Sequence, residues 1–136
     1  MKIVVTGLAV ATAVLMAPPA VADDGVFFVS PLAGISCEID WQREGILDQV
    51  YCQNTSSPQT VILDGNGVLK TCRQPPRADG ITECNLGDPG DAPTLAYGQI
   101  ARSGPFICQS EATGVTCTIP SGLGFTISPS GVVPVG

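Results

Sequence analysis

The residues able to do chemistry in this 136-residue chain are limited first by what is missing. The sequence has six cysteines but no histidine. A Ser-His-Asp site, a Cys-His site and the usual ligand sets of catalytic zinc are therefore excluded. Twelve Asp and Glu residues remain, and two carboxylates at a suitable distance are sufficient for glycoside hydrolysis. Carboxylate chemistry is the enzymatic option that the composition leaves open.

Glu38 and Asp40 are the carboxylate pair with the most suggestive spacing. Apolar and polar residues alternate over residues 35–41, which indicates a half-buried strand. Both acids then lie on the polar face, about 7 Å apart. One hypothesis is a carbohydrate-active hydrolase that uses this pair. The favoured interpretation is simpler, because exposed acids on a strand commonly prevent unwanted edge pairing.

Two turn-like segments, residues 64–67 and 88–91, carry oxygen ligands of the type that calcium prefers. Neither segment has the spacing of an EF-hand loop, and the turn preferences of Asp, Asn, Gly and Pro explain both. We therefore predict no catalytic residue, no metal and no cofactor.

The six cysteines predict disulfides, because their number is even, no Cys-x-x-Cys pair occurs, and the chain starts with an export signal. Neighbouring cysteines enclose glycine-containing turns, and the three pairs recur at nearly equal spacing. This spacing predicts three hairpins, each tied across its own strands by a link worth about 2–3 kcal/mol. An internal repeat and chance explain the spacing equally well. The predicted pairs are Cys37–Cys52, Cys72–Cys84 and Cys108–Cys117.

Residues 1–22 have the pattern of a secretory signal peptide. Lys2 is followed by an apolar stretch over residues 3–16, and Ala20-Val21-Ala22 supplies small residues for cleavage. The apolar stretch is short for a transmembrane helix, although an uncleaved anchor is the alternative. We expect cleavage near Ala22 and an exported single domain over residues 23–136.

The charge balance excludes two classes of partner. The formal net charge is −6, with only six Lys and Arg residues, and cleavage would remove one of these cations. Such a chain has no basic patch for nucleic acid or for an anionic membrane surface. We expect no nucleic-acid partner and no membrane span in the mature form.

The elements that must position these residues are predicted to be short strands. The chain has 16 Gly, 12 Pro and few aromatic residues, which favours turns over long helices. Residues 60–70 read as a hairpin around Asp64-Gly65-Asn66, and residues 125–127 as the last strand. We predict an all-β fold, a small antiparallel sandwich or barrel, with a flexible tail over residues 128–136.

Four short motifs follow one another through the predicted domain. They are Phe28-Val29-Ser30-Pro31 with Gly34-Ile35-Ser36-Cys37, then Leu95-Ala96-Tyr97-Gly98, then Phe106-Ile107-Cys108 with Gly114-Val115-Thr116-Cys117, and finally Gly122-Leu123-Gly124-Phe125. In this arrangement the chain resembles a family of secreted actinobacterial proteins, mycobacterial ones among them, that carries no assigned function. The family's asparagine before Ile35 is absent here, and Ala33 is inserted. The resemblance implies secretion, disulfides and a β-rich fold, and it brings no catalytic residue.

The leading functional hypothesis is a non-enzymatic binding module of the cell envelope or the extracellular space. Its partner is unknown, with a protein or a cell-wall glycan as the options. Recognition is expected on the loops that a stapled scaffold presents, at residues 53–59, 73–79 and 87–93.

Three side chains are weak candidates for binding. Tyr51 is expected to be an exposed aromatic residue, while Trp41, the only tryptophan, is expected in the core. Arg73 and Arg77 flank a proline pair in a rigid loop. This loop also suggests a further alternative, a secreted enzyme inhibitor with residues 73–77 as its reactive segment.

Overall fold

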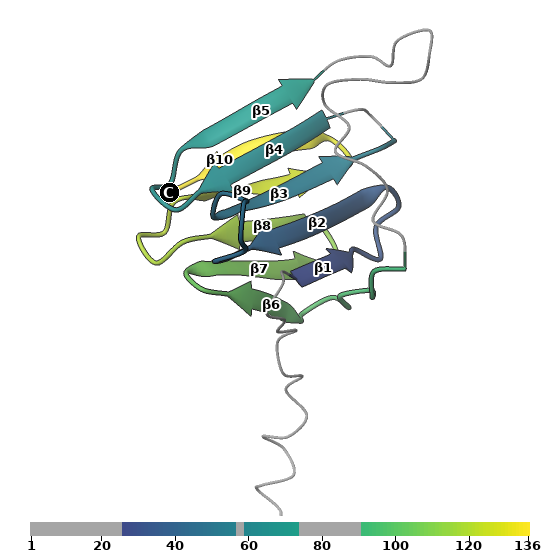
Figure 1. The fold of residues 1–136 in the computed structure, drawn as a ribbon. Helices are drawn as coiled ribbons and strands as arrows, with labels where there is room; N and C mark the ends of the chain where they lie inside the picture. The colour runs from purple at the N-terminus through teal and green to yellow at the C-terminus, as the bar shows by residue number, and fades with distance from the viewer. Residues whose placement is uncertain (1–25, 57–58, 74–90) are drawn as a thin grey trace, which may run out of the picture.

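The computed structural model describes residues 26–56, 59–73 and 91–136. These residues form two five-stranded antiparallel sheets that lie face to face, with ten strands in the described ranges (Figure 1). The predicted signal peptide lies outside them. The all-β prediction is confirmed, and the arrangement is a sandwich. The first sheet contains β1 (Val26–Val29), β2 (Ile35–Asp40), β3 (Gln49–Asn54), β4 (Gln59–Asp64) and β5 (Leu69–Arg73). The second contains β6 (Ile100–Ser103), β7 (Phe106–Glu111), β8 (Gly114–Thr118), β9 (Gly124–Ser128) and β10 (Gly131–Val135).

Each sheet is a simple meander, in which every strand pairs with its neighbours in the chain. Residues 93–95 lie along the outer edge of β1, where the Val29 amide donates to Pro93 O at 2.9 Å. The Leu95 amide returns a bond to Val29 O at 2.8 Å. This segment leads into β6, which contacts β1 and β2 across the sandwich.

The core lies between the sheets and is built from the alternating apolar positions of both. Phe28, Phe106 and Phe125 are its largest fully buried side chains, so three of the four phenylalanines lie there. Trp41 packs against the core while remaining partly exposed, in broad agreement with its predicted place.

Two of the predicted disulfides are confirmed. Cys37 and Cys52 are direct partners in the β2–β3 register, and Cys108 and Cys117 are direct partners in the β7–β8 register. Within the described residues there are thus two stapled hairpins instead of three. Cys72 is not a free cysteine, but its predicted partner Cys84 lies outside the described residues. The Cys72–Cys84 pair stays a prediction.

The predicted flexible tail is wrong where it covers β10. This strand pairs along its whole length with β9, with Val132 opposite Ile127 and Val133 opposite Thr126. Gly131 has a φ of 139°, a value that glycine adopts most readily, and so permits the turn into the strand. Pro134 argued against a strand at these residues, because proline is excluded from central strands. It is tolerated in an edge strand, and β10 is one.

Candidate functional site

The predicted carboxylate pair is part of a compact charged cluster on the outer side of β2 and β3. One nitrogen of Arg43, Nη1, donates to Glu38 Oε2 at 2.6 Å and to Asp40 Oδ1 at 2.5 Å. The Tyr51 hydroxyl donates to the other oxygen of Glu38 at 2.6 Å. The guanidinium carbon also lies 5.9 Å from the centre of the Phe27 ring. The two acids therefore share one cation.

The expected exposure of these acids is wrong. Glu38 is 8% exposed and Asp40 only 2%, although both lie on the face turned away from the core. The loop after β2 brings Arg43 back over them, and Tyr51 covers the other carboxylate oxygen of Glu38. Alternation in the sequence gave the face of the strand correctly, but it carries no information about a loop that folds over that face.

Burial changes the ionisation of this cluster. It is the main cause that raises the pKa of Glu38 to about 7, and a hydrogen bond that the protonated Glu38 carboxyl donates to Asp40 adds to it. The hydrogen bond from Tyr51 and the charge of Arg43 oppose this rise. Burial, and then the contact with Glu38, raises the pKa of Tyr51, so its hydroxyl stays a proton donor. The contact with Asp40 raises the pKa of Arg43, which stays charged.

The cluster is arranged as a structural ion-pair network. A hydrolytic pair needs space between its carboxyl groups for the scissile bond. Here Arg43 lies between Glu38 and Asp40, within hydrogen-bonding distance of both.

A pocket among the described residues lies at the β1–β2 turn, and none of its lining side chains titrates. Its lining residues are Val29, Ser30, Leu32, Ala33, Gly34, Ile35, Ser36 and Thr55.

The cluster anchors the loop at residues 41–48, which joins β2 to β3. The Gln42 amide donates to Asp48 Oδ1 at 2.8 Å, and the Ile46 amide donates to Arg43 O at 3.1 Å. Trp41 packs so closely on the β6–β7 turn that a Cβ on Gly104 would overlap its ring. The loop is thus fixed to both sheets.

Apolar side chains project from this loop and from two others at the same end of the sandwich. Leu47 is 80% exposed, Ile46 40%, Val68 53% and Leu123 40%. Gln49 pairs with Asp64, so the β2–β3 loop lies beside the β4–β5 turn. Gly67 of that turn packs against Leu123 in the β8–β9 loop, and the C-terminal Gly136 also lies against Leu123. We call these four side chains the apolar end; Figure 1 marks the C-terminus there.

No role was assigned from the sequence to residues 42–47, which lie in the predicted turn between Cys37 and Cys52. The available signal was the pair Ile46-Leu47, because two adjacent large apolar residues are unusual in a turn. The exposure of Ile46 and Leu47 could not be predicted from the sequence, because the same pair is equally compatible with a loop that folds onto the core.

The other predicted binding residues are only partly described. Tyr51 is half-buried and bonded to Glu38, not a free exposed ring. Arg73 ends β5, and Arg77 lies outside the described residues. Of the first predicted loop, the described ends belong largely to β3 and β4, where Gln53, Asn54 and Gln59 are buried. The loops at 73–79 and 87–93 lie outside the described residues, except for Arg73 and residues 91–93.

The predicted turn chemistry of Asp64 is visible in the structure. Its Oδ1 accepts the amide protons of Asn66 at 2.8 Å and Val68 at 3.0 Å. The other acidic segment, residues 88–91, is described only at Asp91. A third group with metal-ligand spacing consists of Cys37, Cys52 and Cys117, whose sulfur atoms lie within 4.8 Å of one another. All three are in disulfides and so offer no thiolate to a metal.

None of the described segments forms a helix long and apolar enough to cross a membrane. Comparison with models of protein families gives no match, and neither curated proteins nor solved structures give one. The resemblance to secreted actinobacterial proteins stays a prediction.

Proposed function

We propose that this chain is a non-enzymatic binding module that works after export and recognises a protein through its apolar end. The observation that carries the proposal is the gathering of Ile46, Leu47, Val68 and Leu123 on three neighbouring loops. Contiguous exposed apolar side chains on a soluble domain are typical of interaction sites.

The energetics favour binding at this end. Covering one Leu or Ile side chain contributes roughly 1.5–3 kcal/mol, and Leu47 has most of its surface still to bury. Ordering a mobile loop would offset that gain, at about 0.5–1.5 kcal/mol for each side chain that becomes fixed. The β2–β3 loop is already held by Arg43, Asp48 and Trp41, so little of this ordering is left for the partner to impose.

The charges around the apolar end define the chemistry of the partner. Glu44, Asp48 and Asp64 lie on the same loops or at their edges, whereas the charge of Arg43 is taken up by two carboxylates. A complementary surface presents an apolar side chain beside Lys or Arg. A protein segment has this character. A glycan partner usually requires an exposed aromatic platform. The four side chains of the apolar end are aliphatic, and Trp41 of the same loop is packed on the β6–β7 turn.

Hydrolysis by Glu38 and Asp40 is the weaker candidate. A pKa of about 7 at Glu38 suits a general acid near neutral pH. The guanidinium that bridges the two carboxylates, however, occupies the position a substrate would need. The inhibitor hypothesis rests on residues 73–77, of which only Arg73 is described.

Site-specific photo-crosslinking in the exporting cell tests the proposal. A photoreactive residue replaces Leu47, and a matched one replaces Gln109, which is exposed on the outer face of the second sheet. We expect a defined protein adduct from position 47 and none from position 109. The adduct at position 47 should also weaken when Ile46 and Val68 are changed to Ser. No adduct at position 47, or equal adducts at both positions, would contradict the proposal.

A further inference from the structure

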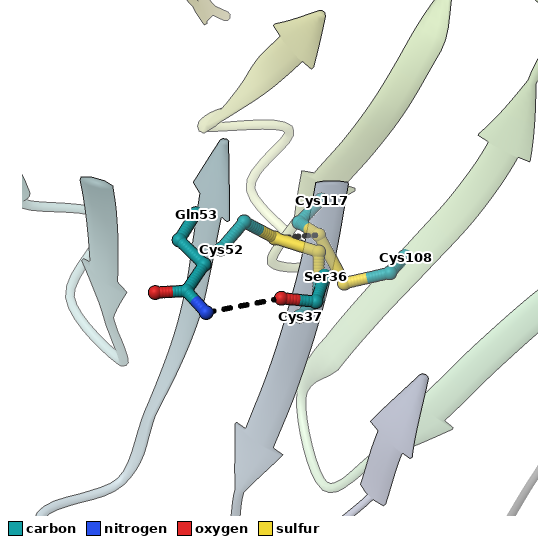
Figure 2. The surroundings of a disulfide bond; sticks show 6 residues. All are labelled: Ser36, Cys37, Cys52, Gln53, Cys108 and Cys117. Atoms are coloured by element: carbon teal, nitrogen blue, oxygen red, sulfur yellow. Dashed lines mark hydrogen bonds between the residues drawn. A yellow bond between two sulfur atoms is a disulfide. The ribbon is translucent and has the colours of Figure 1, made fainter. Parts of the chain in front are cut away.

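The two core disulfides lie against each other at the centre of the sandwich, one from each sheet (Figure 2). Cys52 Sγ of β3 is 4.0 Å from Cys117 Sγ of β8, and the residues are 65 positions apart in sequence. Cys52, Cys108 and Cys117 are fully buried, and Cys37 is 4% exposed. Since disulfide sulfurs carry no hydrogen, this is a nonbonded sulfur–sulfur contact and not a hydrogen bond.

This contact gives the proximity of sulfurs that thiol–disulfide exchange needs. Exchange begins when a thiolate attacks one sulfur of a disulfide and displaces the other. Cys52 and Cys117 are the two sulfurs in contact across the sheets, and Cys37 belongs to the same 4.8 Å group while Cys108 does not. A thiolate at Cys52 would therefore attack Cys117 and release Cys108.

We propose that the sandwich core is a thiol–disulfide exchange site, which converts an intrasheet disulfide into a Cys52–Cys117 link between the sheets. A dithiol first reduces Cys37–Cys52, becoming a disulfide itself and leaving thiols at both cysteines. The Cys52 thiolate then forms a bond to Cys117 as the Cys108–Cys117 bond breaks, and Cys108 takes up a proton. The described core keeps one disulfide and gains two thiols, at Cys37 and Cys108, so atoms and electrons balance.

The same product arises if the dithiol opens the second sheet first. The Cys117 thiolate then attacks Cys52, and Cys37 is released. Once formed, the intersheet link would constrain the unfolded chain more than either intrasheet disulfide does, because it closes a longer loop. The intersheet link closes 65 residues, against 15 for Cys37–Cys52 and 9 for Cys108–Cys117.

A pair of single variants tests the direction of attack without any reductant. Cys37→Ser leaves Cys52 as a thiol beside the intact Cys108–Cys117 disulfide. Cys52→Ser, the matched control, leaves Cys37 as the thiol. Thiols are trapped with a maleimide in acidic denaturant, and peptides are mapped without reduction. For Cys37→Ser we expect a Cys52–Cys117 link and a maleimide on Cys108. The control should keep Cys108–Cys117 and carry the maleimide on Cys37.

The wild-type protein gives a second measurement that does not depend on either variant folding. The native protein is treated with graded dithiothreitol and trapped in the same way. Among molecules that have gained two maleimides on the four core cysteines, we expect these on Cys37 and Cys108, with Cys52–Cys117 as the remaining core link. The proposal is overturned if partly reduced molecules hold only Cys37–Cys52 or Cys108–Cys117. It is also overturned if Cys37→Ser keeps Cys108–Cys117, or if the control rearranges to the same extent.

Discussion

The most consequential single residue outside the core is Arg43, because it compensates two carboxylates that the fold has removed from water. Its own side chain is only 24% exposed. Charges this deeply placed contribute little net stability as a pair, but removing one partner leaves the other charge uncompensated. The network therefore fixes the position of the β2–β3 loop, and loss of one of its members should destabilise the protein.

Arg43→Met should destabilise the protein by about 3 kcal/mol, the lower end of the range for breaking a buried pair, because the guanidinium retains some contact with solvent. Urea unfolding followed by circular dichroism measures this difference. The matched control is Arg102→Met, at an exposed position of β6, which should change stability by less than about 0.5 kcal/mol. Equal effects of the two variants would show that Arg43 is an ordinary surface residue.

The raised pKa of Glu38 predicts a pH dependence with a definite sign. In the unfolded chain the carboxyl has its ordinary value of 4.5, and in the fold it is raised to about 7. The folded state thus binds the proton more tightly, so this contribution is complete below pH 4.5 and is lost as pH rises through about 7. Its size is at most about 3 kcal/mol. The stability of wild type minus that of Glu38→Gln, measured by urea unfolding from pH 4 to 8, should fall as pH rises, because the amide of the variant does not titrate. A difference that does not change with pH would refute this.

At the scale of single residues, the sequence predicted that Glu38 and Asp40 lie on one face of a strand. It also predicted the disulfide between Cys37 and Cys52. Both follow from period-2 alternation and short separation along the chain. The bond from Tyr51 to Glu38 and the place of Arg43 depend on the path of a loop, which alternation does not encode.

At the scale of the elements, the strands and turns at the edges of the sheets are the ones that the sequence pattern did not predict. The central hairpins were recognisable from alternation and turn residues. β10 was not, since its Gly, Pro and Val composition reads equally as a tail. The contact between Trp41 and the β6–β7 turn likewise could not be predicted from the sequence, because Trp41 and Gly104 are 63 positions apart in the chain.

Two neighbouring valines of β10 test whether this strand is packed. Val132 packs against the core, while Val133 is 62% exposed. Val132→Thr should cost about 1 kcal/mol, since it brings a hydroxyl group towards an apolar surface. Val133→Thr makes the same chemical change and should stay within about 0.5 kcal/mol of wild type. Thermal or urea unfolding measures both, and equal effects would restore the flexible-tail interpretation.

Gly104 and Gly98 test the contact between Trp41 and the β6–β7 turn. Both have positive φ, 59° and 89°, so an alanine meets similar backbone strain at each. Only at Gly104 does the added methyl group overlap the Trp41 ring; around Gly98 there is open space. Gly104→Ala should shift the emission of this only tryptophan to longer wavelength, and Gly98→Ala should not. Identical spectra for both variants would mean that the contact is absent.

At the scale of the whole sandwich, the described residues form two meanders of five strands, each with a disulfide between its second and third strands. The sequence predicted the class of fold and these two links, because hairpins are local. It did not predict the division into two halves. That division falls between β5 and β6, and no local pattern in the strands themselves marks it.

The same organisation brings the loops of both sheets to one end, where the apolar side chains and three carboxylates lie. Each loop alone is unremarkable in sequence. The proposed recognition surface is thus a property of the assembled sandwich. It requires each sheet to keep its own disulfide, which we call the covalent frame of that sheet.

Peptide mapping of the unreduced, maleimide-trapped native protein tests this frame most directly. The account predicts Cys37–Cys52 and Cys108–Cys117 as separate links, with Cys72–Cys84 as the third. Alternation places Cys72 on the face of its sheet opposite to Cys37 and Cys52, away from the core sulfurs. A link from Cys37 or Cys52 to any other cysteine in protein never exposed to a reductant would contradict the account.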